Sequence, residues 1–275
     1  MPRGNADSRT GAMIELHADA VALFASDMHL GEHDRASAAH FFRAFDRIAP
    51  AATHLFLLGD LFETWAGDDQ PDETADALVA RLRALADRGT ALFVVRGNRD
   101  FLIDAPLPDA GDTVSFSRRS GARLLEDPSV VRLFGRRVLL AHGDALCTDD
   151  VEYQRARAVA RSEAWQRDFL ARPLAERLEI ARQLRDTSRR VQAARALQGG
   201  EPGDVAADAV ETALRAFDAD ALIHGHTHRP ARHRHDVDGT TRERWVLSDW
   251  HAAAEGRAAR GTFLRVDREG WRSLE

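Results

Sequence analysis

The chain contains no lysine, only one cysteine and no hydrophobic run long enough to cross a bilayer. All 38 of its basic residues are arginines. The single cysteine, Cys147, excludes an internal disulfide framework and is typical of a reducing compartment. No apolar run approaches the ~20 residues that a membrane-spanning helix needs, and the polar start lacks the apolar core of a secretion signal. These absences favour a cytoplasmic protein.

The residues that are present fit one large domain that carries an insertion. The chain has 275 residues, of which 44% are hydrophobic. Its net charge of −6 argues against a nucleic-acid partner, because nucleic-acid-binding domains are usually basic. Nothing in the sequence indicates an obligate protein partner. Residues 1–12 are polar and predicted to form a disordered tail, and residues 13–150 and 201–275 are predicted to form the core.

Five short apolar runs each end just before residues that commonly bind metal ions. Runs of this length and content predict buried strands. In an open α/β sheet, ligands gather beyond the carboxyl ends of the strands. The sequence therefore predicts a site on one rim of a sheet, built by the runs Val21–Ser26, His54–Leu58, Ala91–Val95, Val138–Ala141 and Ala221–Ile223.

Helical patterns separate the first strands. Apolar residues recur at helical spacing over Arg35–Ile48 and Asp72–Arg88, so strand and helix alternate as in a parallel α/β sheet. A hairpin is predicted to turn at Gly135. The segments Arg242–Leu247 and Thr262–Val266 read as short strands, which makes the later part of the sheet more antiparallel.

Residues 151–200 differ from the rest of the chain. They hold eleven arginines against six acidic residues, and their apolar residues recur at helical spacing. We interpret them as a helical insertion. Two interpretations remain: a solvated helical pair packed on the core, or a lid over the strand-end site, which is favoured because the segment begins soon after His142.

The residues that follow the five runs supply seven oxygen or nitrogen ligands and no thiolate. Seven ligands are too many for one tetrahedral zinc ion and suit two ions that share a carboxylate. Alternate residues of an extended chain share a face, so the Asp-x-His and His-x-His pairs should each point to one side. Mn²⁺, Fe²⁺ and Zn²⁺ remain open. The predicted ligands are Asp27, His29, Asp60, Asn98, His142, His226 and His228.

The order of these motifs resembles the calcineurin-like metallophosphoesterase superfamily. The longer segments that contain them are similar to the UDP-2,3-diacylglucosamine diphosphatase family within it. The resemblance implies an α/β fold, an α+β sandwich with two central mixed sheets flanked by helices and a helical lid insertion. The matching segments are Ser26–Leu30, Leu58–Glu63, Trp65–Asp69, Arg96–Leu102, Ala141–Asp150, Ile223–Pro230 and Trp250–His251.

The resemblance also implies a reaction. One Mn²⁺ ion would be held by Asp27, His29, Asp60 and His228, and a second by Asp60, Asn98, His142 and His226. A hydroxide that bridges the two ions would attack the α-phosphorus of UDP-2,3-diacylglucosamine. The products would be UMP and 2,3-diacylglucosamine 1-phosphate, in lipid A biosynthesis. The catalytic set implied in this way is Asp60, Asn98, Arg99 and His142.

Arg99 stands where general members of the superfamily have a histidine. A guanidinium cannot donate a proton at working pH, but it can bind a diphosphate through two hydrogen bonds. The resemblance implies that the substrate contacts are Asn98, Arg99, Asp150, Ser188, Gln192, Arg195 and His226. Gln192 and Arg195 replace an asparagine and a lysine of better-known relatives.

The insertion suits an acylated, anionic substrate, because arginines can bind phosphate while apolar residues shelter acyl chains. We expect Arg155, Arg157 and Arg161 to attract an anionic membrane surface, which would place the protein peripherally on the cytoplasmic face of the inner membrane. Two other functions remain open. One is a di-metal phosphodiesterase for soluble nucleotides, and the other is a non-catalytic scaffold.

Overall fold

Two six-stranded sheets form the centre of the protein. The computed structural model describes residues 13–197 and 203–275, so the expected tail over residues 1–12 lies outside the described part. Both sheets contain parallel and antiparallel neighbours. The first has the order β12 (Gly270–Leu274), β11 (Phe263–Asp267), β2 (Ala22–Ala25), β3 (His54–Leu58), β4 (Ala91–Val95) and β5 (Arg123–Leu125). The second has the order β1 (Glu15–Leu16), β6 (Ser129–Leu133), β7 (Arg136–Leu140), β8 (Ala221–His224), β10 (Thr240–Val246) and β9 (Ala231–Val237).

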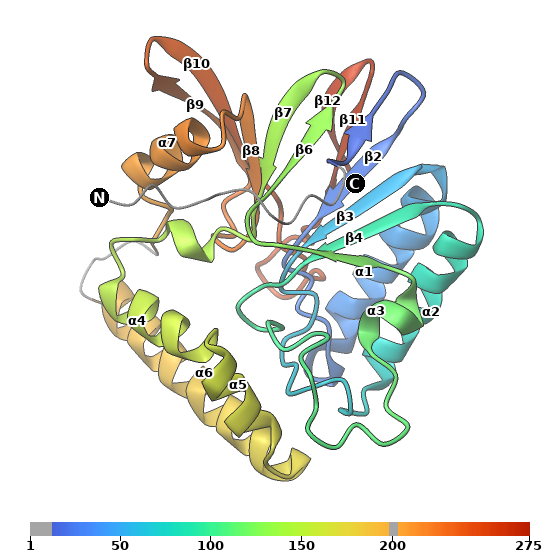
Figure 1. Ribbon diagram of the computed structural model, residues 1–275, viewed down its shortest axis with the longest axis vertical. Coiled ribbons are helices and arrows are strands. Elements are labelled where there is room, and N and C mark those ends of the chain that lie inside the picture. The colour runs from blue at the N-terminus through green and yellow to red at the C-terminus, as the bar shows by residue number, and fades with distance from the viewer. Residues whose placement is uncertain (1–12, 198–202) are drawn as a thin grey trace, which may run out of the picture.

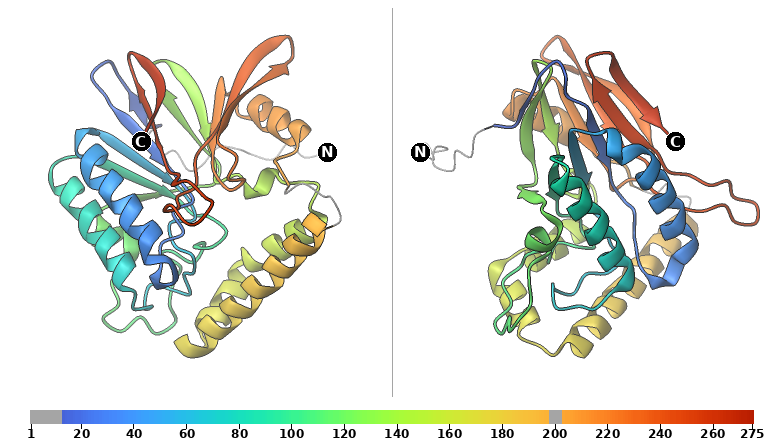
Figure 2. Two further views of the ribbon diagram at one scale, coloured as in Figure 1. Left: turned by 180° about the vertical axis from the view of Figure 1, so that it is seen from behind. Right: turned by 90° about the vertical axis from the view of Figure 1, so that its right-hand side faces the viewer.

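The two sheets pack face to face, and helices cover their outer faces (Figures 1 and 2). Phe56 stacks between Phe24 and Phe93 in the layer between the sheets, with ring centroids 4.8 Å apart on both sides. Burying a side chain of this size contributes about 1.5–3 kcal/mol. The first sheet is covered by α1 (Arg35–Ile48), α2 (Glu73–Asp87) and α3 (Phe116–Ser120), and the second by α7 (Ala207–Ala216). The 3-10 turns are Glu32–Asp34, Ala49–Ala51 and Asp144–Leu146.

The two mixed sheets and flanking helices implied by the resemblance are confirmed. The helices predicted at Arg35–Ile48 and Asp72–Arg88 are α1 and α2, and Asp72 caps α2 by accepting from Thr74 N and Ala75 N. The expectation of one sheet with one rim is wrong, because β2, β3 and β4 lie in one sheet and β7 and β8 in the other. The ligand-bearing strand ends therefore meet at the junction of two sheets.

The segment after β7 forms a separate group of helices, drawn in yellow-green and yellow in Figure 1. It consists of α4 (Val151–Ala160), α5 (Glu163–Leu170) and α6 (Leu174–Leu197). Asp150 caps α4 and Ser162 caps α5, each accepting a hydrogen bond from a backbone N–H of the first turn. In the described residues, no helix combines the length and the apolarity that crossing a membrane requires.

Candidate metal centre

Five of the seven predicted ligands have left-handed rather than extended backbone. Among the described residues, nine non-glycine positions have positive φ, and five of them are predicted ligands. Such backbone is uncommon outside glycine and gathers at functional sites. The expectation that Asp-x-His and His-x-His would converge along an extended chain is therefore wrong, although the pairs do converge. The five values are 55° for Asp27, 47° for His29, 51° for Asp60, 68° for His226 and 53° for His228.

Two glycines allow these turns to approach one another. A Cβ atom on Gly97 would lie 2.1 Å from Oδ1 of Asp60, and one on Gly225 would lie 2.2 Å from Oδ2 of Asp27. Real Cβ atoms do not tolerate such contacts. Any side chain at these positions would push the carboxylates out of the centre.

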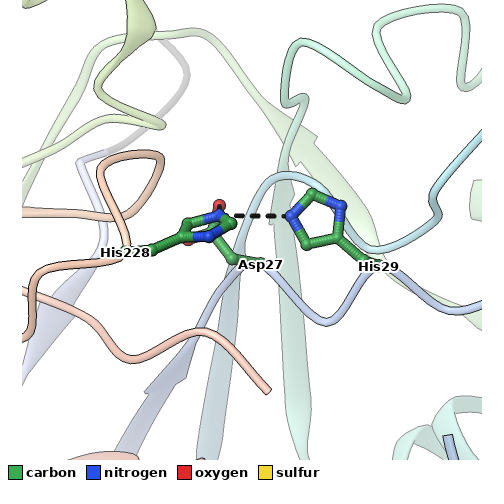
Figure 3. Close-up of side chains that lie close together, drawn as sticks. All are labelled: Asp27, His29 and His228. Carbon is green, nitrogen blue, oxygen red and sulfur yellow. Dashed lines mark hydrogen bonds and ion pairs between the residues drawn. The ribbon is translucent and has the colours of Figure 1, made fainter. Parts of the chain in front are cut away.

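Three residues meet at the first half of the centre, shown in Figure 3. The Nε2 atoms of His29 and His228 are 3.2 Å apart. His228 Nε2 lies 3.4 Å from Asp27 Oδ1, and His29 Nε2 lies 3.8 Å from Asp60 Oδ2. Asp27 is fully buried, and both of its oxygens accept a hydrogen bond from the backbone N–H of His226.

The second half is built around Asn98. Its Oδ1 lies 2.9 Å from His142 Nε2 and 2.9 Å from His226 Nδ1. His142 Nε2 is also 3.6 Å from Asp60 Oδ1. Asp60 thus lies between the two halves, and the seven predicted ligands are all brought together.

Hydrogen bonds on the far side of two rings set their orientation. The Nδ1 atom of His142 lies 2.9 Å from the carbonyl oxygen of Leu58, and His29 Nδ1 lies 2.9 Å from Glu63 Oε2. Both partners are acceptors, so each Nδ1 donates and each neutral ring keeps a lone pair on Nε2 for the centre. Histidines that bind metals are usually held in this way. Sequence reasoning did not assign a role to Glu63, although it closes a motif that carried the resemblance.

The electrostatics of the centre favour positive charge. Burial opposes protonation of His142, yet the carboxylates of Asp60 and Asp27 raise its pKa to about 9. Burial likewise opposes ionisation of Glu63, yet its hydrogen bond to His29 lowers its pKa to about 2. When the rings are neutral, the centre offers carboxylate oxygens, Asn98 Oδ1 and Nε2 lone pairs as electron donors. This donor set fits divalent cations bound by imidazole and oxygen ligands.

A cavity of about 250 Å³ adjoins the centre. Its floor includes Asn98 and Arg99, and the backbone N–H of Arg99 donates to Asp60 Oδ1 over 2.8 Å. Its other wall comes from the helices of the insertion and is mainly apolar. The apolar lining residues on these helices are Ala156, Ala160, Trp165, Phe169, Ala181 and Leu184.

The predicted substrate contacts divide into three groups. Asn98, Arg99 and Ser188 line the cavity. Asp150 caps α4 and His226 lies in the metal centre, and neither is among the described residues that line the cavity. Gln192 and Arg195 fall in α6, but their side chains lie outside what the structure describes.

Two of the three insertion arginines predicted to contact a membrane turn inward. Arg157 Nε donates to Asp144 Oδ2 over 2.7 Å, and Arg161 donates to the carbonyl oxygen of Gly97 over 2.9 Å. Asp144 is fully buried and also accepts from the Tyr153 hydroxyl. Burial opposes its ionisation, but His142 and the Arg157 hydrogen bond hold the pKa of Asp144 below its ordinary value. Of the three arginines expected at a membrane, only Arg155 is well exposed.

Comparison with known proteins agrees with this geometry. The family described as calcineurin-like phosphoesterase matches residues 21–230. A protein of Aromatoleum aromaticum named UDP-2,3-diacylglucosamine hydrolase is 46% identical over 249 residues, which cover 90% of this chain and 94% of that protein.

Proteins of the same name occur in Stenotrophomonas maltophilia and Chromobacterium violaceum. The first is 42% identical, with 90% of this chain and 96% of that protein covered. The second is 43% identical, with 91% and 97% covered. Family membership implies a divalent metal cofactor, for which the residues above are candidate ligands. The chain is therefore a hydrolase that belongs to the calcineurin-like phosphoesterase family, in the group of its UDP-2,3-diacylglucosamine hydrolases.

Proposed function

We propose that the protein hydrolyses the diphosphate of UDP-2,3-diacylglucosamine to UMP and 2,3-diacylglucosamine 1-phosphate, a step of lipid A biosynthesis. One observation carries the proposal. A single cavity joins the acceptor-rich centre at Asn98 to the apolar inner surface of the insertion helices. An acylated phosphate ester combines a phosphate group, which suits the centre, with apolar acyl chains, which suit the helix surface. The name of the relatives supports the same substrate.

The seven predicted ligands would hold two divalent cations, and we propose Mn²⁺ as the metal. One would be held by Asp27, His29, Asp60 and His228, and the other by Asp60, Asn98, His142 and His226. When bound, the cations would supply Lewis acidity, which lowers the pKa of water and offsets phosphate charge.

The chain's own residues would orient the diphosphate. Arg99 lines the cavity, and its backbone N–H donates a hydrogen bond to Asp60. Its guanidinium would bind two phosphate oxygens and stabilise charge as it develops on them. The leaving group is an anionic phosphate that needs little protonation, so a cation can take the place of an acid here.

We propose that residues 151–200 act as a lid that selects the acyl chains. Trp165 and Phe169 stack at 4.8 Å and, with Leu184, give the cavity its apolar wall. Ser188 on α6 would donate to the polar head of the substrate. We keep Asp150, Gln192, Arg195 and His226 as proposed substrate contacts.

We also propose that the protein visits the cytoplasmic face of the inner membrane. Val151, Arg155 and Val159 follow one another at four-residue spacing on α4. Val151 and Val159 are 53% and 58% exposed. This strip would insert shallowly into the membrane surface, beside anionic lipid headgroups, without crossing the bilayer. Sedimentation with anionic and with neutral vesicles tests the association, and equal recovery in both pellets would contradict an electrostatic contribution.

The decisive assay uses the purified protein with Mn²⁺, a chelator control and UDP-2,3-diacylglucosamine in ¹⁸O-labelled water. We expect UMP to carry the label, because attack at the α-phosphorus places the new oxygen on the uridine side. Label in the lipid phosphate instead would refute attack at that atom. Cyclic nucleotides serve as competing substrates, and faster turnover of these would favour a phosphodiesterase for soluble nucleotides.

A further inference from the structure

A second cavity, of about 280 Å³, shares lining residues with the first. Arg157 and Arg161 line both cavities and so stand at their junction. The second cavity also has Arg96, Glu126 and Asp127 in its wall, so charged side chains dominate it. The first cavity, by contrast, is mainly apolar. The two cavities are thus neighbours, one mainly apolar and the other mainly charged.

The second cavity lies against the metal centre. Asp127 Oδ1 accepts a hydrogen bond from the backbone N–H of His142 over 3.2 Å. Arg161, on the opposite wall, donates to the carbonyl oxygen of Gly97, which precedes Asn98. A substrate cleaved at the centre could therefore place one of its two ends in this cavity.

Two buried polar atoms of the wall have no hydrogen-bond partner among the described residues. They are Oδ2 of Asp127 and Nε of Arg96. The Asp127 side chain is only 9% exposed, and its Oδ2 forms an ion pair with Arg157 Nη2 at 3.6 Å but accepts no hydrogen bond from the described residues. Buried polar atoms are nearly always satisfied, so each unsatisfied one needs an explanation. Both residues line the cavity, and an acidic and a basic residue in one wall suggest a ligand with both donor and acceptor groups.

We propose that this second cavity binds the nucleoside of a nucleoside diphosphate substrate, with Asp127 accepting from the ribose hydroxyls and Arg96 lying against the base. Carboxylates commonly bind ribose hydroxyls, and guanidinium groups stack on flat rings. The diphosphate would then pass Arg157 and Arg161 at the junction, and the acyl chains would occupy the first cavity. This inference rests on the proposed function. A site for phosphate alone fits less well, because two carboxylates face the cavity.

Calorimetry on the full, Mn²⁺-loaded chain tests this without turnover. The ligands are UMP, 2′,3′-dideoxyuridine monophosphate and inorganic phosphate. We expect UMP to bind on the order of 10-fold more tightly than the dideoxy compound, because a hydrogen bond to a carboxylate is lost. In Asp127→Asn, which keeps an oxygen for the backbone N–H of His142, this preference should fall below about 3-fold.

Two further variants complete the experiment. Arg96→Gln should weaken the binding of both nucleotides but not that of inorganic phosphate. This variant tests the proposed site if Asp127→Asn fails to fold. The exposed carboxylate of Asp109 provides the control, and Asp109→Asn should leave all three affinities unchanged. The inference is overturned if UMP binds no better than phosphate, or if the preference for the ribose survives Asp127→Asn.

Turnover of UDP-2,3-diacylglucosamine is measured separately on the wild type. Absence of turnover, together with UMP binding that depends on Asp127, would refute the proposed function and keep the nucleoside site. Turnover, together with UMP binding that does not depend on Asp127, would support the proposed function and refute the nucleoside site.

Discussion

The metal centre and the insertion helices face the same cavity, but they are held in place in opposite ways. Asp27, Asp60 and His142 are at most 2% exposed. Backbone groups from neighbouring strand ends fix them, including the N–H groups of His226 and Arg99. Moving any of them would break several buried hydrogen bonds at once, so this region should be rigid.

Besides Phe169 and Leu170, which are buried in the core against the first sheet, the insertion touches the core through a few arginines. Arg161 donates to the carbonyl of Gly97, and Arg185 donates to the carbonyl of Glu63 over 2.7 Å. Arg177 donates to the carbonyl of Ala66 over 2.6 Å and pairs with Asp69. A region attached by few contacts opens at lower free energy than the core does. The comparison teaches that reactivity and substrate choice depend on separable parts of the molecule.

The largest effect should come from breaking the centre. Asp60→Ala removes the carboxylate that lies between the two halves, 3.8 Å from His29 and 3.6 Å from His142. We expect turnover to fall by about 10⁴-fold, the scale of losing an essential member of a catalytic group, and both metal ions to be lost. Elemental analysis measures the metals. Near-normal metal content would mean that Asp60 does not join the two sites.

Arg99→Ala should have the second-largest effect. Turnover should fall by about 10²–10³-fold, the scale of losing one charge-stabilising donor, while metal content stays normal. The backbone N–H that bonds Asp60 remains in this variant. Arg99→Lys is the control, and it should recover part of the activity because it keeps the charge but not the two-pronged geometry. Activity of Arg99→Ala equal to wild type would exclude a role in binding the phosphates.

The sequence predicted which side chains would come together, because metal sites need particular residue types at strand ends. Asp27, His29 and Asp60 follow apolar runs that became β2 and β3, and the order of the motifs supplied the rest. Periodicity could not show that the strands divide between two sheets, because a strand pattern does not encode which neighbour it pairs with. Periodicity also missed strand β9, in which exposed residues alternate with polar residues that are only partly buried.

Residues that act through other residues were not assigned a role from the sequence, although Glu63 and Asp144 lie in segments that carried the resemblance. Glu63 orients His29, which lies 34 positions away in the sequence. Asp144 accepts hydrogen bonds from Tyr153 and Arg157. The inward turn of Arg157 and Arg161 was also missed. A basic helix looks alike whether its arginines face a membrane or a buried carboxylate, and only the packing distinguishes the two.

A third prediction concerns the attachment of the lid. Arg177 is 3% exposed, and Arg177→Ala removes its bonds to Ala66 and Asp69. We expect the KM for acylated substrate to rise about 10-fold, which corresponds to roughly 1.4 kcal/mol of docking energy, with unchanged turnover of a simple activated phosphodiester. Arg182→Ala is the matched control, since Arg182 lies on the same helix but is 60% exposed. Equal losses on both substrates would show that the lid and the centre are one structural unit.

The smallest effect should appear where the chain returns from the lid to the core. Arg244 makes two hydrogen bonds to Asp204, at 2.8 and 3.1 Å. Burial raises the pKa of Asp204, but the Arg244 hydrogen bond outweighs it and lowers the pKa to about 2. A lowered pKa in the folded state means that the carboxylate stabilises the fold above pH ~4 and loses this contribution as the pH falls toward 2. Because Asp204 is 31% exposed, the contribution should be about 1 kcal/mol after screening.

Denaturant unfolding of Asp204→Asn at several pH values measures this contribution. The variant should be less stable than wild type at pH 7, and the two should converge near pH 2, because protonation removes the same charge from the wild type. Asp238→Asn is the control, since Asp238 pairs with Arg215 but is 63% exposed. A difference between Asp204→Asn and wild type that persists unchanged at pH 2 would mean that shape rather than charge holds this return segment. In that case, the contacts between charged residues that attach the lid to the core would not extend to the C-terminal end of the lid.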